Sequence, residues 1–251
     1  MIFQMKSTTC NIDLLLHWAD TLLILSQRNA EWCGHGPILE QDIAITNISL
    51  DLLGQSRTFY QHAASLIGND ATEDSLAYLR KEREFKNLLL VEQPNGDWAQ
   101  TILRQYFFSQ FQQLFFPILQ NGKDEQLAAI AEKSMKEIAY HVRWSSEWVI
   151  RLGDGTEESR NRLIHAMSEL WRYTGEMFMP AEYEKELGFD VSSCKEAWMQ
   201  KITAVMTEAT LTVPEKIFMQ SGGKTGKHTE HLGYILTELQ YLQRTYPGAT
   251  W

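Results

Sequence analysis

Glu137 and His141 raise the first chemical question in this sequence, because carboxylate and imidazole side chains are ligands that iron accepts. Di-iron carboxylate proteins place a Glu and a His three residues apart on each of two bundle helices, so that both reach the metal. Glu137 and His141 are four residues apart, a spacing that also suits a hydrogen-bonded or ionic pair on one helix face. We favour the structural pair and keep a metal site as the alternative.

No histidine of the chain has a glutamate three residues before it. The residues at that position are Leu14, Trp32, Phe59, Ile138, Arg162, Thr225 and His228. Because a di-iron bundle needs two Glu-x-x-His pairs, the sequence predicts no metal site of this kind and no metal cofactor. His228 and His231 are three residues apart near a helix start, but a zinc site there would lack a nearby third ligand.

Two other motifs that could carry catalysis also fail. The G-G-K-T stretch at residues 222–225 superficially suggests a P-loop, but Phe218 stands where the motif needs a glycine, and no strand precedes it. The chain also lacks a G-x-S-x-G sequence for a hydrolase serine. The residues themselves therefore give no catalytic group.

Composition excludes several classes of partner. The net charge of −9 and a pI near 5.3 disfavour a nucleic-acid groove, and no basic run suggests a membrane surface. The 3 cysteines are scattered and form no C-x-x-C pair, which disfavours a disulfide framework and a zinc or iron–sulfur site. We see no signal peptide, and the apolar runs are too short to span a bilayer, so we expect a cytoplasmic protein.

Apolar residues recur at helical spacing through most of the chain. The expected helices cover residues 12–30, 40–67, 75–91, 98–119, 125–152, 157–178, 195–212 and 229–246. No segment alternates apolar and polar residues as a strand would. We therefore expect an all-α chain with one domain, residues 1–251, built as a ferritin-like four-helix bundle with additional helices.

Two of these helices carry specific expectations. In 40–67, the apolar positions from Ile43 to Leu66 predict one buried face, and in 98–119 Pro117 should bend or end the helix. Aromatic residues wrap the second helix too widely for a single core stripe. They include Phe107, Phe108, Phe111, Phe115 and Phe116. Either that helix is buried on all sides, or its outer face meets a partner.

Several blocks of the chain, between residues 12 and 251, resemble the PaaC family. They are residues 31–35 (EWCGH), 50–57 (LDLLGQSR), 87–98 (NLLLVEQPNGDW), 136–141 (KEIAYH), 228–233 (HTEHLG) and 242–251 (LQRTYPGATW). Members of this family are structural, non-catalytic subunits of bacterial phenylacetyl-CoA epoxidase, a multicomponent di-iron monooxygenase of aerobic phenylacetate degradation.

The resemblance implies a set of partners and a role. It implies a catalytic di-iron sister subunit that this chain would stabilise, and contact with phenylacetyl-CoA. Without the sister subunit, we expect the aromatic surface of residues 98–116 to drive self-association into a homodimer. The alternatives are a di-iron oxygenase or oxidase with unusual ligands and a free-standing helical binding protein. Metal content and co-purification with a homologous subunit would discriminate among them.

The resemblance also implies a degenerate metal site. The sister's D-E-x-G-H pattern corresponds to residues 51–55, and its K-E-E-x-F-H pattern to residues 136–141, with an aliphatic residue at each ligand Glu. The implied positions are Glu31, Leu52, Gln55, Ser109, Ile138 and His141. Glu31 would keep a first-helix carboxylate. We expect Leu52 and Ile138 to be buried together near His141, filling the space of the metal.

Finally, the resemblance places acyl-CoA contacts on two stretches. They comprise Glu84, Phe85, Lys86 and Asn87, and Tyr183, Glu184, Lys185, Glu186 and Leu187. Lys86 could pair with a CoA phosphate, although a solvated lysine on a charged helix face is the interpretation we favour slightly.

Overall fold

The computed structural model describes residues 2–215 and 217–249, which form helices and connecting segments without a strand. The α-helices are α1 (Ile2–Ala30), α2 (Leu39–Ile67), α3 (Glu73–Tyr78), α4 (Leu89–Glu92), α5 (Trp98–Gln120), α6 (Glu125–Gly153), α7 (Glu157–Leu170), α8 (Glu182–Leu187), α9 (Lys195–Glu208), α10 (Glu230–Leu239) and α11 (Tyr241–Thr245). Short 3-10 helices are η1 (Glu82–Glu84), η2 (Trp171–Tyr173), η3 (Gly175–Phe178), η4 (Val191–Cys194) and η5 (Gly223–Thr225).

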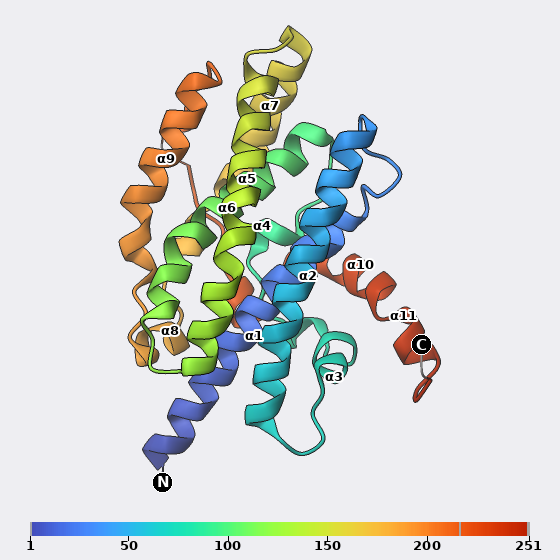
Figure 1. Ribbon diagram of the computed structural model, residues 1–251, viewed down its shortest axis with the longest axis vertical. Coiled ribbons are helices and arrows are strands. Elements are labelled where there is room, and N and C mark those ends of the chain that lie inside the picture. Colours follow the sequence, from blue (N-terminus) through green and yellow to red (C-terminus); the bar gives the residue numbers. More distant parts are fainter. Residues whose placement is uncertain (1, 216, 250–251) are drawn as a thin grey trace.

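The long helices α1, α2, α5 and α6 form the bundle, which confirms the predicted all-α, ferritin-like architecture. α1 packs along α2, α5 packs along α6, and α2 also meets α6. α7 and α9 cover α5 and α6, while α10 and α11 extend away from the bundle beside α3 (Figure 1). No helix among the described residues is long and apolar enough to cross a membrane.

The expected helix at 75–91 is wrong, since the chain there changes conformation several times. Lys81, Phe85 and Leu88 adopt extended backbone angles between α3, η1 and α4. Tertiary contacts explain the departure, because Phe85 is fully buried and the amide of Lys86 donates to the carboxylate of Asp20 at 2.8 Å. A continuous helix would satisfy that amide internally, so periodicity alone cannot reveal this course.

Other boundaries differ less. Pro117 lies inside α5, which continues to Gln120. The expected helix at 157–178 ends as α7 at Leu170 and continues as η2 and η3, and α8 lies between this expected helix and the one at 195–212. The C-terminal helix is divided into α10 and α11 at Gln240. The bundle helices themselves begin or end close to their predicted limits.

The aromatic residues of α5 lie inside this chain. Phe107, Phe108, Phe111, Phe115 and Phe116 are all fully buried. On one side they stack against Trp18 of α1, and on the other Phe107 contacts Trp171 and Trp198 at 5.6 Å between ring centroids. The hypothesis that these rings meet a partner subunit is therefore wrong, and α5 is a buried central helix.

The apolar residues of α2 do not all face inward as expected. Ala44, Ile48 and Leu52 are buried against the bundle, but Ile43 is 51% exposed on the outer side. The helix therefore has apolar residues on two faces, and only one of them is covered by this chain.

Candidate functional site

Leu52 and Ile138, two of the positions that the resemblance assigns to a degenerate metal site, are both fully buried. Two hydrogen bonds join their neighbours across α2 and α6. Gln55 Nε2 donates to Glu137 Oε2 at 2.8 Å, and His141 Nε2 lies 3.1 Å from Asp51 Oδ2. These bonds bring Leu52 and Ile138 to the same level, beside His141.

Amide side chains extend this polar remnant toward α5. Gln112 Nε2 donates to Gln55 Oε1 at 2.8 Å, so Gln55 joins α5, α2 and α6. Ser109 is fully buried and accepts from Gln105 Nε2 at 2.7 Å, and Gln105 in turn accepts from Asn29 of α1. Neutral amides thus bond to one another across the bundle centre, although Asn29 Oδ1, Gln112 Oε1 and His141 Nδ1 are buried without a partner.

The side of α1 that packs on α2 is apolar at this level. Serine-to-carbonyl bonds from Ser26 to Ser49 and from Ser56 to Ala19 fix the alignment of α1 with α2, which places the buried Leu22 beside Leu52.

Glu31 lies beyond this alignment, five residues past Ser26, or roughly 8 Å further at the rise of an α-helix. It is exposed and bonds Arg28 at 3.1 Å and Asn95 at 2.7 Å, so the structure does not bring it to the bundle centre.

The residues present at the centre do not fit a di-iron group. Asp51, Glu137 and His141 are engaged pairwise with other side chains, and the two places that would need carboxylates hold aliphatic residues. Within residues 2–215 and 217–249, no three His, Cys, Asp or Glu side chains come together as a metal site would require. One imidazole and two carboxylates that are already paired cannot offset the dehydration of two iron ions.

A second polar region lies where the irregular segment 80–92 crosses α1. Its centre is Asp20, which is fully buried on α1. The carboxylate accepts from Tyr60 Oη at 2.5 Å, from the Lys86 amide at 2.8 Å and from both terminal nitrogens of Arg80. The guanidinium of Arg80 also lies 4.4 Å from the ring centre of Phe85. A single buried carboxylate of α1 thereby bonds both α2 and the segment 80–92.

Glu92 holds the C-terminal part of the chain to the same segment. Its Oε1 accepts from the amide and hydroxyl of Thr229 at 2.6 and 2.7 Å, and its Oε2 accepts from Asn87 at 2.8 Å and lies 2.9 Å from His228 Nδ1. His228 Nε2 lies 2.9 Å from the carbonyl oxygen of Phe85. Both ring nitrogens of His228 therefore face acceptors, which leaves neither for zinc.

This environment favours the charged form of His228. Burial by itself disfavours an imidazolium, but the hydrogen bond and the negative charge of Glu92 outweigh it, so the pKa of His228 is raised. A protonated ring can donate from Nδ1 to Glu92 and from Nε2 to Phe85 at the same time.

The G-G-K-T stretch belongs to this network, and its lysine is engaged by a carboxylate of the same chain. Lys224 Nζ lies 2.9 Å from Glu184 Oε1, and both side chains are buried. Glu176 accepts from the amides of Leu89 at 2.8 Å and Gly222 at 2.7 Å, while its burial raises its pKa.

The two expected substrate stretches meet at one point. Lys86 Nζ lies 5.8 Å from the ring centre of Tyr183 and 3.4 Å from Asp13 Oδ1, with about a quarter of the Lys86 side chain exposed. His17 Nδ1 lies 2.7 Å from the carbonyl oxygen of Lys86, and burial lowers the pKa of His17 to about 3. The neutral ring donates through Nδ1, which leaves His17 Nε2 and the Tyr183 hydroxyl buried without a partner.

Not all residues of these stretches can reach a ligand. Phe85, Asn87 and Glu184 are fully buried and engaged within the chain. Glu84, Lys185 and Glu186 are exposed, and Leu187 is half-buried. Only part of each stretch is therefore available at the surface, and Tyr183 itself is buried beneath the partly exposed Lys86.

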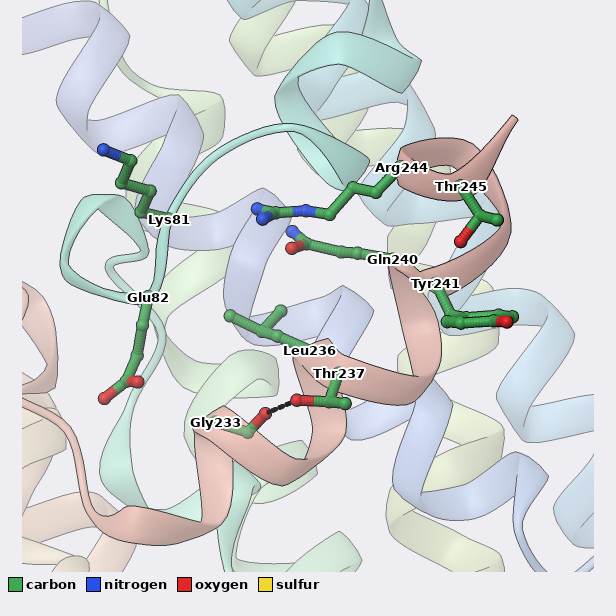
Figure 2. A pocket seen from close by; sticks show the side chains of 9 residues that line it. All are labelled: Lys81, Glu82, Gly233, Leu236, Thr237, Gln240, Tyr241, Arg244 and Thr245. Atoms are coloured by element: carbon green, nitrogen blue, oxygen red, sulfur yellow. Dashed lines mark hydrogen bonds between the residues drawn. The ribbon is translucent and has the colours of Figure 1, made fainter. Parts of the chain in front are cut away.

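A pocket of about 390 Å³ adjoins the first stretch, between η1 and the helices α10 and α11. Figure 2 shows Lys81 and Glu82 on one side of it and the side chains of Gln240 and Arg244 on the other. Both Gln240 Nε2 and Arg244 Nη2 donate to the carbonyl oxygen of Arg80 at 3.0 Å. These hydrogen bonds attach the C-terminal helices to the irregular segment 80–92.

Sequence reasoning missed the residues that organise this second region. His17, Asp20 and Arg80 were not singled out, although one signal was present. His17 and Asp20 interrupt the long apolar run from Leu14 to Leu25, where a polar residue must find a buried partner. The partners themselves, such as Arg80, lie 60 residues away and carry no local signal.

Comparison with known proteins adds an independent finding. The family model described as "Phenylacetic acid catabolic protein" matches residues 3–251. The chain is also 48% identical, over 241 residues, to an Escherichia coli (strain K12) protein whose name makes it a subunit of 1,2-phenylacetyl-CoA epoxidase. That match covers 94% of this chain and 97% of the relative.

Proposed function

The chain belongs to the phenylacetic acid catabolic protein family, and we propose that it is a non-catalytic structural subunit of a phenylacetyl-CoA epoxidase. Its role would be to bind and stabilise a catalytic di-iron subunit of the same family. In this proposal the chain acts as one helical domain in the cytoplasm, and electron transfer and oxygen chemistry belong to its partners.

One observation carries the assignment to a non-catalytic role. The positions that match the sister family's ligand glutamates hold Leu52 and Ile138, which are fully buried and packed into the core. Leu22 of α1 lies at the same level and is equally buried. A centre lined this way gains hydrophobic stabilisation and has no carboxylates to neutralise two iron ions.

The proposal extends to two further contacts. Lys86, which is partly exposed beside the buried ring of Tyr183, would meet the phenylacetyl-CoA held by the complex. A lysine ammonium at this edge suits a CoA phosphate. In the absence of the catalytic subunit, the isolated chain would pair with a second copy of itself.

Co-expression with the di-iron subunit tests the proposal. We expect the two chains to co-purify in a stable complex, and we expect epoxidation of phenylacetyl-CoA only when the di-iron subunit holds its metal. Removing the ligands of the sister subunit should abolish turnover while leaving the complex intact. Turnover of phenylacetyl-CoA by this chain alone with an electron donor would overturn the proposal, as would failure of the two chains to associate.

A further inference from the structure

A glycine-rich loop lies against both of the stretches that we expect to meet acyl-CoA. It comprises residues 222–226 (GGKTG), which include η5, and we call it the 222–226 loop. Gly223 and Lys224 are buried within it. Since the segment is not a P-loop, its glycines and its lysine need another explanation.

The first stretch runs directly along the backbone of this loop. A Cβ atom added at Gly223 would lie 2.1 Å from the carbonyl oxygen of Asn87, and one at Gly226 would lie 2.2 Å from that of Arg83. Both distances are too short for any side chain, so only glycine lets the two backbones approach this closely. Gly226 also has a φ of +76°, which other residues rarely adopt. The loop therefore fixes the backbone on both sides of Lys86.

One buried carboxylate strengthens this attachment. Glu176 Oε1 accepts from the amide of Gly222 at 2.7 Å, and its Oε2 accepts from the amide of Leu89 at 2.8 Å. Separating the loop from the first stretch would leave a buried amide or carboxylate oxygen without its partner, which is costly. Beyond the loop, His228 Nε2 lies 2.9 Å from the carbonyl oxygen of Phe85 and continues the attachment.

Lys224 attaches the second stretch to the same loop. Its Nζ lies 2.9 and 3.0 Å from the two carboxylate oxygens of Glu184 and donates to the carbonyl oxygen of Met179 at 3.1 Å. Glu184 lies within α8 and also accepts from the amide of Ala181 at 2.6 Å, so the ion pair holds the helix as well as the side chain. Because both charges are buried, breaking the pair would leave one of them uncompensated.

We propose that the 222–226 loop positions the two acyl-CoA stretches relative to one another, with Gly223 setting the backbone beside Lys86 and Lys224 setting α8. The inference rests on the acyl-CoA contact included in the proposed function, and it adds the residues that fix the geometry of that contact. Gly223 and Lys224 are buried and do not touch the ligand. They act through Lys86 and through the exposed Lys185 of α8.

The two stretches and α1 converge at one point, which makes their spacing sensitive to the loop. His17 of α1 bonds the carbonyl oxygen of Lys86 at 2.7 Å, and its ring centre lies 6.0 Å from that of Tyr183. Burial and, after it, the positive charge of Lys224 lower the pKa of His17, so the ammonium of Lys224 lies close to this point. A ligand held by both stretches would lose affinity if a shift of the loop changed their spacing.

Two changes in the loop test the inference in the complex with the catalytic di-iron subunit. Gly223→Ala should displace the backbone at Asn87. Lys224→Met together with Glu184→Gln removes the ion pair without leaving a buried charge, an exchange that proteins often tolerate. We expect each variant to raise the KM for phenylacetyl-CoA between about twofold and thirtyfold with little change in kcat, because a positioning residue alters binding through its neighbours.

Gly153→Ala is the matched control. A Cβ atom at Gly153 would lie 2.3 Å from the carbonyl oxygen of Ala209, which is a comparable clash. It lies where α6 and α9 end, at the opposite end of the molecule from α8 (Figure 1). The KM should therefore stay unchanged in Gly153→Ala. An equal rise in this control would overturn the inference, because general destabilisation would then explain the effect.

Combination with Lys86→Ala separates positioning from an independent effect. Lys86→Ala alone should raise the KM, and Gly223→Ala should raise it less in that background than in the unaltered chain. Full multiplication of the two effects would overturn the inference. An unchanged KM in both loop variants, when Lys86→Ala raises it, would overturn the inference and leave the acyl-CoA contact intact. An unchanged KM in Lys86→Ala itself would contradict that contact in the proposed function, and the inference would fall with it.

Discussion

The bundle centre and the region around Asp20 differ in the polar side chains that they bury. At the centre, Leu52 and Ile138 are fully buried, and Gln55 bonds both Glu137 of α6 and Gln112 of α5. Around Asp20 and Glu92, by contrast, charged side chains are fully buried and bond to residues far away in the sequence.

The difference shows what each region has to do. Four regular helices need only complementary packing to stay together, so the centre can replace ligands by aliphatic and amide side chains. The segment 80–92 has few internal backbone hydrogen bonds, so its course depends on buried carboxylates that accept several donors at once. In this chain, fully buried carboxylates are found where they fix an irregular segment, at Asp20 and Glu92.

Asp20→Ala should have the largest effect of the changes considered. It removes the acceptor of Tyr60, Arg80 and the Lys86 amide and leaves a buried guanidinium unpaired, which typically costs about 3 to 5 kcal/mol. Asp13→Ala is a matched control on the same helix, because its pair with Lys86 is partly exposed and worth about 1 kcal/mol or less. Chemical denaturation measures both, and equal effects would show that burial of Asp20 does not govern the region.

Leu52→Ala should be the strongest single change at the bundle centre. It opens a cavity in a fully buried site and should lower the free energy of unfolding by about 2 to 5 kcal/mol. Leu53→Ala, one residue along on the partly exposed face, should change it by about 0.5 kcal/mol or less in the monomer. Thermal melting of the two variants compares the faces directly, and a harmless Leu52→Ala would contradict the packed centre.

Gln55→Ala should cost less than either change. It leaves the amide of Gln112 and the carboxylate of Glu137 without their partner, a loss of about 1 to 3 kcal/mol. Gln55→Leu is the informative companion, because it keeps the volume while removing both hydrogen bonds. If Gln55→Leu were as stable as the unaltered protein in denaturant titration, the amide chain would contribute nothing to the bundle.

The pH dependence of the free energy of unfolding should show the smallest effect, and this effect should come from His228 beside Glu92. The raised pKa of His228 means that the folded protein holds a proton that the unfolded chain releases above its ordinary pKa near 6.5. Stability from this group is complete below that value and is lost as pH rises through the folded-state pKa. His228→Gln should flatten this decline in denaturation profiles between neutral and alkaline pH, and an unaltered profile would contradict a protonated His228.

His17 contributes with the opposite sign. Its pKa of about 3 in the folded protein lies below the unfolded value, so its stability is complete above pH 6.5 and is lost as pH falls toward 3. His17→Gln should remove part of the acid-side decline and leave the alkaline side unchanged. The two histidine variants thereby distinguish the alkaline decline of stability, which comes from His228, from the acid decline, which comes from His17.

The four bundle helices could be predicted from sequence because a periodic apolar pattern determines each of them locally. Segment 80–92 could not, because its conformation depends on contacts with Asp20 and His228 far away in the chain. The same limit explains Ile43, since apolar spacing on α2 does not reveal which of two faces the bundle covers. For the candidate site, comparison of motifs placed Leu52 and Ile138 at one level, but Glu31 required the alignment of α1 with α2.

Iron analysis of the purified chain tests the central claim most directly. The chain would be expressed alone in iron-replete medium, and in parallel with the catalytic di-iron subunit, and both preparations would be analysed for iron and manganese per polypeptide. We predict far less than one metal ion per chain in the isolated protein, and metal in the complex in proportion to the catalytic subunit. Near-stoichiometric iron or manganese bound to the isolated chain would contradict the account.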